Sequence, residues 1–125
     1  MPDDVFGLCN SPAEAWYRQG AEAGHSLAMA SLGTLLRARG ALAEAEIWYR
    51  RGAEDGHNGA MTGLAELLKE RGDLTEAEAW FRRAAENGHA EAMTHLGILF
   101  AMRGELTEAE AWFRRAVEGS HTEVT

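Results

Sequence analysis

Apolar residues recur along the chain at intervals of three and four, which is the spacing of one face of an α-helix. Two kinds of predicted helix alternate, and we name them A helices and B helices. The marker positions of the A helices are Met29, Leu32 and Leu36, then Met61, Leu64 and Leu68, then Met93, Leu96 and Phe100. Those of the B helices are Ala45, Trp48, Tyr49 and Gly52, then Ala77, Trp80, Phe81 and Ala84, then Ala109, Trp112, Phe113 and Ala116. The pattern predicts an all-α fold.

The alternation of helices has a strict period of 32 residues. The residues that mark this period are Trp16, Trp48, Trp80 and Trp112, with His25, His57, His89 and His121, and with Gly40, Gly72 and Gly104. A fixed period of this length is typical of solenoids, in which each repeat buries its apolar face against its neighbours. We therefore predict an α-solenoid of antiparallel helix pairs, with about seven helices in all.

The repeat register also predicts the domain boundaries. We expect a tail or cap at residues 1–10, a repeat domain at 11–121 and a C-terminal tail at 122–125. The domain comprises a half repeat at 11–25, which lacks its A helix, and full repeats at 26–57, 58–89 and 90–121. Because terminal repeats expose faces that a neighbour would cover, we expect a dimer, or a monomer–dimer equilibrium, through a terminal repeat.

Residues near the predicted helix ends fit known capping patterns. Ser or Thr stands three residues before a glutamate, as in a capping box, in the pairs Ser11 with Glu14, Thr75 with Glu78, and Thr107 with Glu110. Glycine follows each helix, where it can adopt the left-handed conformation of a C-terminal cap. Each B helix also pairs a glutamate with an arginine four residues later, which we interpret as a solvated face contributing only about 0.2–0.5 kcal/mol per pair.

The repeat resembles the tetratricopeptide repeat, whose pattern is Trp-x-x-Leu-Gly-x-x-Tyr followed by Ala-x-x-x-Phe. The residues that carry the resemblance are Met29, Leu32, Gly33, Leu36, Ala45 and Tyr49, with their equivalents from Met61 to Phe81 and from Met93 to Phe113. The unit is 32 residues long instead of about 34, and histidine stands where the family has proline. The run Trp-Tyr/Phe-Arg-Arg-x-Ala-Glu-x-Gly-His-x-x-Ala-Met, for example at residues 80–93, resembles the Sel-one-like branch of the superfamily.

The resemblance implies a right-handed α-solenoid whose A helices line a concave groove that takes up a peptide or a helix. Carried onto this sequence, with His95 and Met102 added from the same helix, the groove residues are Leu27, Ala30, Thr34, Arg37, Thr62, Glu66, Lys69, Glu91, Thr94, His95, Ile98, Ala101 and Met102. These residues vary between repeats while the core positions do not. We interpret this contrast as a constant scaffold with a diversified surface, the alternative being a face that tolerates change because nothing binds there.

Composition narrows the choice of partner. Twenty acidic and twelve basic residues give a formal net charge of −8, which repels phosphate backbones and anionic lipid headgroups, so we expect neither nucleic acid nor membrane as a partner. The single cysteine, Cys9, cannot form an internal disulfide. No secretion signal is evident, and no segment approaches the about 20 apolar residues of a membrane span, so we expect a cytoplasmic protein.

Candidate chemistry is sparse. Successive repeat histidines should lie on the order of 10 Å or more apart, which is too far to share a zinc ion, so we interpret them as caps of the joints between repeats. The recurring tryptophans suggest one packing slot used in every repeat. With no phosphate-binding loop and no pairing of nucleophile and base, we expect a protein that is not an enzyme and holds no metal or cofactor.

The sequence is compatible with two functions. The first is an adaptor that binds a peptide or helix of a partner protein in the groove. The second is a structural module that self-associates and leaves the groove empty. Changing Arg37, Lys69 and Ile98 together should abolish partner binding, without altering helix content or mass, only if the first is right. An accessory domain for an enzyme on another chain would bind in the same way.

Overall fold

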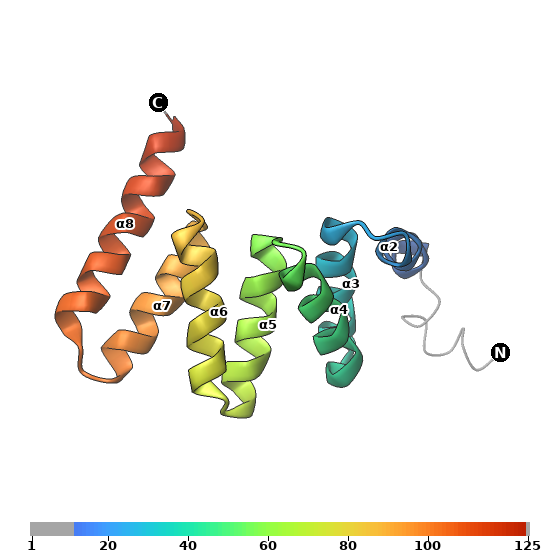
Figure 1. The fold of residues 1–125 in the computed structure, drawn as a ribbon, viewed down its shortest axis with the longest axis horizontal. Coiled ribbons are helices and arrows are strands. Elements are labelled where there is room, and N and C mark those ends of the chain that lie inside the picture. The colour runs from blue at the N-terminus through green and yellow to red at the C-terminus, as the bar shows by residue number, and fades with distance from the viewer. Residues whose placement is uncertain (1–11, 125) are drawn as a thin grey trace. The chain divides into compact units, whose positions relative to one another are not determined.

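The computed structural model describes the backbone of residues 12–124 and the side chains of residues 12–118. Over that range the chain forms seven α-helices, which confirms the predicted all-α array (Figure 1). They are α2 (Pro12–Glu22), α3 (Ser26–Arg39), α4 (Leu42–Glu54), α5 (Asn58–Arg71), α6 (Leu74–Glu86), α7 (Ala90–Met102) and α8 (Leu106–Val124). None of these helices combines the length and hydropathy that crossing a membrane requires.

The helices alternate as the pattern predicts, with α3, α5 and α7 as A helices and α2, α4, α6 and α8 as B helices. The chain divides into two compact units, Met1–Leu64 and Ala65–Thr125, and the division falls inside α5. Within the first unit α3 packs against α2 and α4, and within the second unit α7 packs against α6 and α8. Within each unit, therefore, an A helix packs between the B helices that precede and follow it in the sequence.

Glycine in the left-handed conformation ends the helices at the joints, with φ between 82° and 97° at all six positions. At the joint between α3 and α4, Gly40 N–H donates to the carbonyl of Arg37, and Ala41 N–H donates to that of Leu36 at 2.8 Å. These are the two hydrogen bonds of a Schellman cap. The same pair of bonds recurs at the other joints, so the predicted glycine caps are confirmed.

The capping boxes at Thr75 and Thr107 were predicted two residues too far along the chain. Helix α6 begins at Leu74 with Asp73 as its N-cap, and α8 begins at Leu106. The glycine cap explains the difference, because Asp73 N–H closes the preceding helix on Leu68 while its carbonyl already accepts from Ala77 N–H. The third predicted box, at Ser11, lies outside the described residues.

Aromatic rings of the B helices pack against glycines of the A helices. In the first unit the buried ring of Tyr49 lies against Gly33 on α3 and Gly63 on α5. A Cβ atom at Gly63 would lie only 2.4 Å from the Cε1 atom of Tyr49, so no larger residue fits without movement. In the second unit Gly97 meets the ring of Phe113 in the same way. The glycine of the repeat pattern thus makes room for the neighbouring ring.

The tryptophans do not share one buried slot, and that prediction is wrong. Trp48 is buried, but Trp16 is 73 % exposed. From the second tryptophan onward an arginine three residues later covers the ring, with the guanidinium carbon of Arg51 lying 4.7 Å from the centroid of Trp48. Arg83 and Arg115 cover the next two rings in the same way. Trp80 and Trp112 are half-buried. The aromatic residue next to the tryptophan is buried at Tyr49 and Phe81, whereas Tyr17 is 38 % exposed.

Candidate functional site on the A helices

The predicted groove residues of the first unit lie on α3 and the first half of α5. Leu27 and Thr34 are exposed and Arg37 is half-buried, as a binding surface requires. Ala30 and Thr62 are buried, which removes both from the predicted surface. Ala30 offers only one methyl group, and the Thr62 hydroxyl donates to the carbonyl of Asn58 at 3.0 Å.

In the second unit, residues of α7 form a continuous stripe along one helix face. Its members are spaced three and four apart, as neighbours on one face of a helix are: Glu91, Thr94, His95, Ile98, Ala101 and Met102. The amino-terminal end of the stripe is polar, and the carboxyl-terminal end carries Ile98 at 37 % exposure and Met102 at 67 %. Together with Glu66 and Lys69 on α5, both half-buried, these are the predicted groove residues of this unit.

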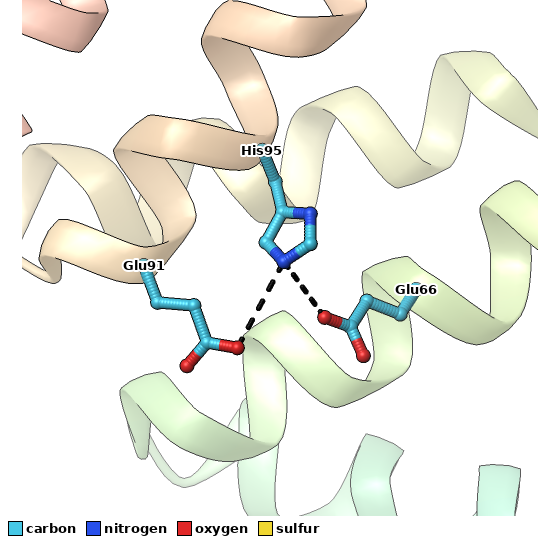
Figure 2. A group of neighbouring side chains, drawn as sticks. All are labelled: Glu66, Glu91 and His95. Carbon is cyan, nitrogen blue, oxygen red and sulfur yellow. Dashed lines mark ion pairs between the residues drawn. The ribbon is translucent and has the colours of Figure 1, made fainter.

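Two residues of the stripe meet a side chain of α5, and Figure 2 shows Glu66, Glu91 and His95 pointing toward one another. His95 Nε2 lies 2.8 Å from Glu66 Oε2 and 3.8 Å from Glu91 Oε2. Glu66 comes from α5, and the other two come from α7. We name these residues the Glu–Glu–His cluster. The sequence placed all three on the A-helix face but did not predict that they meet.

The position of His95 follows from the packing of the repeat. His95 stands 32 residues after Gly63, which lies on the ring of Tyr49. Its imidazole stacks on the equivalent ring, Phe81, with centroids 5.0 Å apart and planes inclined by 11°. Helix α6 thus holds the imidazole in place from beneath. The signal in the sequence was a histidine at a position where the preceding repeats have a small residue.

The repeat histidines occupy N-cap positions, but only one of them is seen to cap with its side chain. His57 Nδ1 accepts a hydrogen bond from Ala60 N–H at 3.1 Å. His25 and His89 have N-cap backbone conformations without a side-chain bond to the helix. The side chain of His121 lies outside the described residues. His25 and His89 thus stand at the predicted capping position, and His57 adds a side-chain hydrogen bond there.

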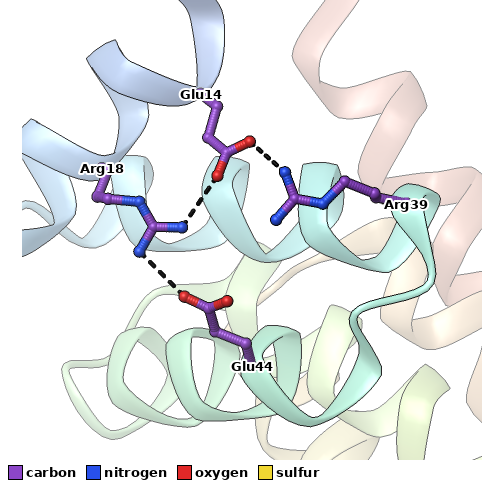
Figure 3. Close-up of polar contacts among 4 residues, drawn as sticks. All are labelled: Glu14, Arg18, Arg39 and Glu44. Carbon is purple, nitrogen blue, oxygen red and sulfur yellow. Dashed lines mark hydrogen bonds and ion pairs between the residues drawn. The ribbon is translucent and has the colours of Figure 1, made fainter. Parts of the chain in front are cut away.

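The glutamate–arginine pairs of the B helices are not all solvated, which corrects their interpretation as an outer face. Glu14 is only 5 % exposed, and its carboxylate contacts Arg18 at 3.0 Å and also Arg39 at the end of α3 (Figure 3). Arg18 in turn reaches Glu44 on α4 at 3.0 Å. The hydrogen bond to Glu14, with a smaller one to Glu44, raises the pKa of Arg18. The network links α2 to both helices of the next repeat.

The second unit repeats this arrangement. Glu78 accepts from Arg82 on its own helix at 3.0 Å and from Arg103 at the end of α7 at 2.9 Å. Glu110 holds the same repeat position on α8 but is 70 % exposed and pairs with Arg114 at 3.1 Å. Arg39 in the first unit and Arg103 in the second thus each link an A helix back to the preceding B helix.

The Glu78 network predicts a pH dependence of stability. The hydrogen bond from Arg103, and then that from Arg82, lowers the pKa of Glu78 below its ordinary value of 4.5. A lowered carboxyl pKa contributes stability that is present above pH 4.5 and is lost as pH falls through the folded-state pKa. Urea unfolding of the wild type and Glu78→Gln should therefore differ most near neutral pH and converge in acid. A constant difference across this range would contradict the assignment.

Comparisons with known proteins agree with this geometry. The tetratricopeptide repeat family matches residues 53–89 and 62–122, which together span more than half of the chain. No curated protein matches the sequence. A solved structure described as "Crystal structure of MamA" has the same fold, with a TM-score of 0.68 at 17 % identity. The match covers 79 % of this chain and 60 % of the MamA chain, so the present chain spans about three-fifths of that protein. The chain belongs to the tetratricopeptide repeat family.

Proposed function

We propose that this chain is an adaptor whose A-helix face binds a peptide or helix of a partner protein. Tetratricopeptide repeats generally mediate protein–protein interactions, and proteins of the family are usually scaffolds without catalytic activity. No catalytic family matches the sequence. The proposal adds to these general properties a defined surface and a partner of defined chemistry.

The observation that carries the proposal is the exposed apolar end of the α7 stripe. Ile98 and Met102 lie four residues apart on one face, next to the partly exposed Ala101. Fully burying such a side chain contributes about 1.5–3 kcal/mol, and an isoleucine and a methionine together make an anchor for a partly apolar segment. The net charge of −8 favours a segment that is neutral or basic over an acidic one.

The test replaces apolar surface residues with glutamate on the two kinds of helix. Ile98→Glu and Met102→Glu should each weaken binding of the purified partner at least tenfold, about 1.4 kcal/mol, because both place a charge where the partner buries apolar surface. Ile47→Glu on α4 is the matched control, since Ile47 is also exposed, at 56 %, but lies on a B helix. Cross-linking in the native cell first identifies the partner. Titration calorimetry then measures its affinity for each variant.

The outcomes separate the proposal from its rivals. Affinity that falls for the α7 variants and stays unchanged for Ile47→Glu supports the A-helix face. Equal losses in all three variants, or a loss confined to Ile47→Glu, would overturn it. Circular dichroism of each variant establishes that helix content is preserved.

The alternative function, self-association, is supported by the surface of α8. Val117 is exposed, and it lines a shallow depression with Glu110 and Phe113. The equivalent glutamate on α6, Glu78, is covered by an arginine of the next A helix. A second copy could cover the face of α8 in a comparable way. Light scattering that shows a dimer unaffected by the α7 variants, in a protein that captures no partner, would favour this function.

Within the family we place the chain in the Sel-one-like branch. The support is the joint between repeats, where His57 replaces the proline of the general pattern and its imidazole caps α5 through Ala60 N–H. The joint spans only Asp55 to His57 between α4 and α5, in keeping with the shorter unit.

A further inference from the structure

We infer that the Glu–Glu–His cluster binds a divalent transition-metal ion, with Zn²⁺ as the reference ion. This site goes beyond the proposed adaptor function and does not depend on it. Glu66, Glu91 and His95 are brought together from two successive A helices, and together they provide three candidate ligand atoms.

The donor set selects the class of ion. Imidazole nitrogen is a good ligand for zinc, copper, iron and nickel, whereas magnesium and calcium prefer oxygen ligands alone. One imidazole and two carboxylates would also neutralise a divalent charge, since the two glutamates supply two negative charges. The cluster therefore favours a transition-metal ion over Mg²⁺ or Ca²⁺.

The distances within the cluster are close to those that an ion needs. Zinc lies about 2.0–2.2 Å from nitrogen and oxygen ligands, so tetrahedral ligands lie about 3.4 Å from one another. The two distances from His95 Nε2, 2.8 Å and 3.8 Å, lie on either side of this value. All three ligand atoms lie within 4.8 Å of one another. Small rotations of the two glutamates are enough to close them around one ion.

The surroundings prepare the cluster for binding. Stacking on Phe81 fixes the plane of the His95 ring with Nε2 toward both carboxylates. Glu66 is half-buried, so its side chain has little conformational entropy to lose on binding an ion. Glu91 is 63 % exposed, so its side chain is able to rotate in the solvent toward the ion. The exposed side leaves a position for a water molecule, and three protein ligands with one open position is a common zinc arrangement.

The Nδ1 atom of His95 limits the expected affinity for the metal ion. An ion on Nε2 would leave the imidazole proton on Nδ1, and this buried atom has no hydrogen-bond partner. A hydrogen-bond acceptor for the imidazole N–H that faces away from the metal typically raises metal affinity by about 10–100-fold. We therefore expect an exchangeable site that is weaker than a structural zinc site.

The first unit offers an internal comparison. The positions equivalent to the cluster, 32 residues earlier, are Thr34, Gly59 and Gly63, none of which is a good metal ligand. The cluster is therefore specific to the second unit, and the expected stoichiometry is one ion per chain.

The test is titration calorimetry of the full chain with Zn²⁺ alone. We expect one ion per chain for the wild type, and at least tenfold weaker binding for His95→Ser, Glu66→Gln and Glu91→Gln. His95→Ser should keep the fold, because Ser31 holds the same position in the first unit. His25→Ser is the matched control, since it also removes one histidine but lies on the other unit, and its affinity should equal that of the wild type.

A second measurement keeps the result independent of folding. The visible spectrum of bound Co²⁺ should change in His95→Ser while the far-ultraviolet circular dichroism does not. Absence of binding at one ion per chain would overturn the inference, and so would equal affinity in the wild type and His95→Ser. Loss of binding in His25→Ser would point instead to the repeat histidines and would also overturn it.

Discussion

Replacing Glu14 by alanine is expected to lower the free energy of unfolding by about 2 kcal/mol. The carboxylate is buried and accepts from Arg18 and Arg39, so its removal takes away an anion that both guanidinium groups contact, while Arg18 keeps its bond to Glu44. Breaking a fully buried ion pair costs about 3–5 kcal/mol, and the cost here is smaller because both arginines keep part of their contact with water. Urea unfolding followed by circular dichroism measures the change.

The matched control for this prediction is Glu110→Ala, which removes the same residue of the repeat from a B helix. Glu110 is 70 % exposed and makes a pair within its own helix, so the change should stay within about 0.5 kcal/mol. Equal effects of the two substitutions would show that the link to Arg39 contributes nothing. Glu14→Gln keeps the side-chain volume and removes only the charge. A large loss of unfolding free energy in this variant as well would indicate that the negative charge holds Arg18 and Arg39.

Helix positions and joints could be predicted from the sequence because their causes are local. The spacing of Met29, Leu32 and Leu36 lies within one helix, and all three side chains are buried as predicted. The left-handed glycine at each joint, such as Gly40, is likewise a property of a few consecutive residues. The same reasoning placed the helix start at Thr75 incorrectly, since the cap of one helix leads directly into the next.

The different roles of equivalent residues could not be predicted, because their causes lie on other helices. Glu14 and Glu110 share one local pattern, a glutamate four residues before an arginine, yet one is buried and the other exposed. The difference comes from Arg39, which approaches Glu14 from the next helix, 25 residues away. No pattern within a single B helix contains that information.

The candidate site shows the same division. Its residues were found on the A helices because the repeat register assigns one face to each helix. The meeting of Glu66 with His95 depends on the stacking of His95 on Phe81, which brings a residue of α7 toward α5. The burial of Ala30 was missed because a position on a helix face does not reveal how far a short side chain reaches between longer neighbours.

Replacing Gly63 by alanine is expected to destabilise the chain by about 1–3 kcal/mol, although alanine in a helix is intrinsically favoured over glycine by about 1 kcal/mol. The added Cβ would lie 2.4 Å from Cε1 and 2.6 Å from Cζ of Tyr49, and that ring is held by the bond between its hydroxyl and Thr34 at 2.8 Å. A double-mutant cycle with Tyr49→Leu isolates the clash, since Gly63→Ala should become neutral or stabilising once the ring is gone. A Gly63→Ala variant as stable as the wild type, measured by urea unfolding, would mean that the ring can move aside and that this glycine is not required.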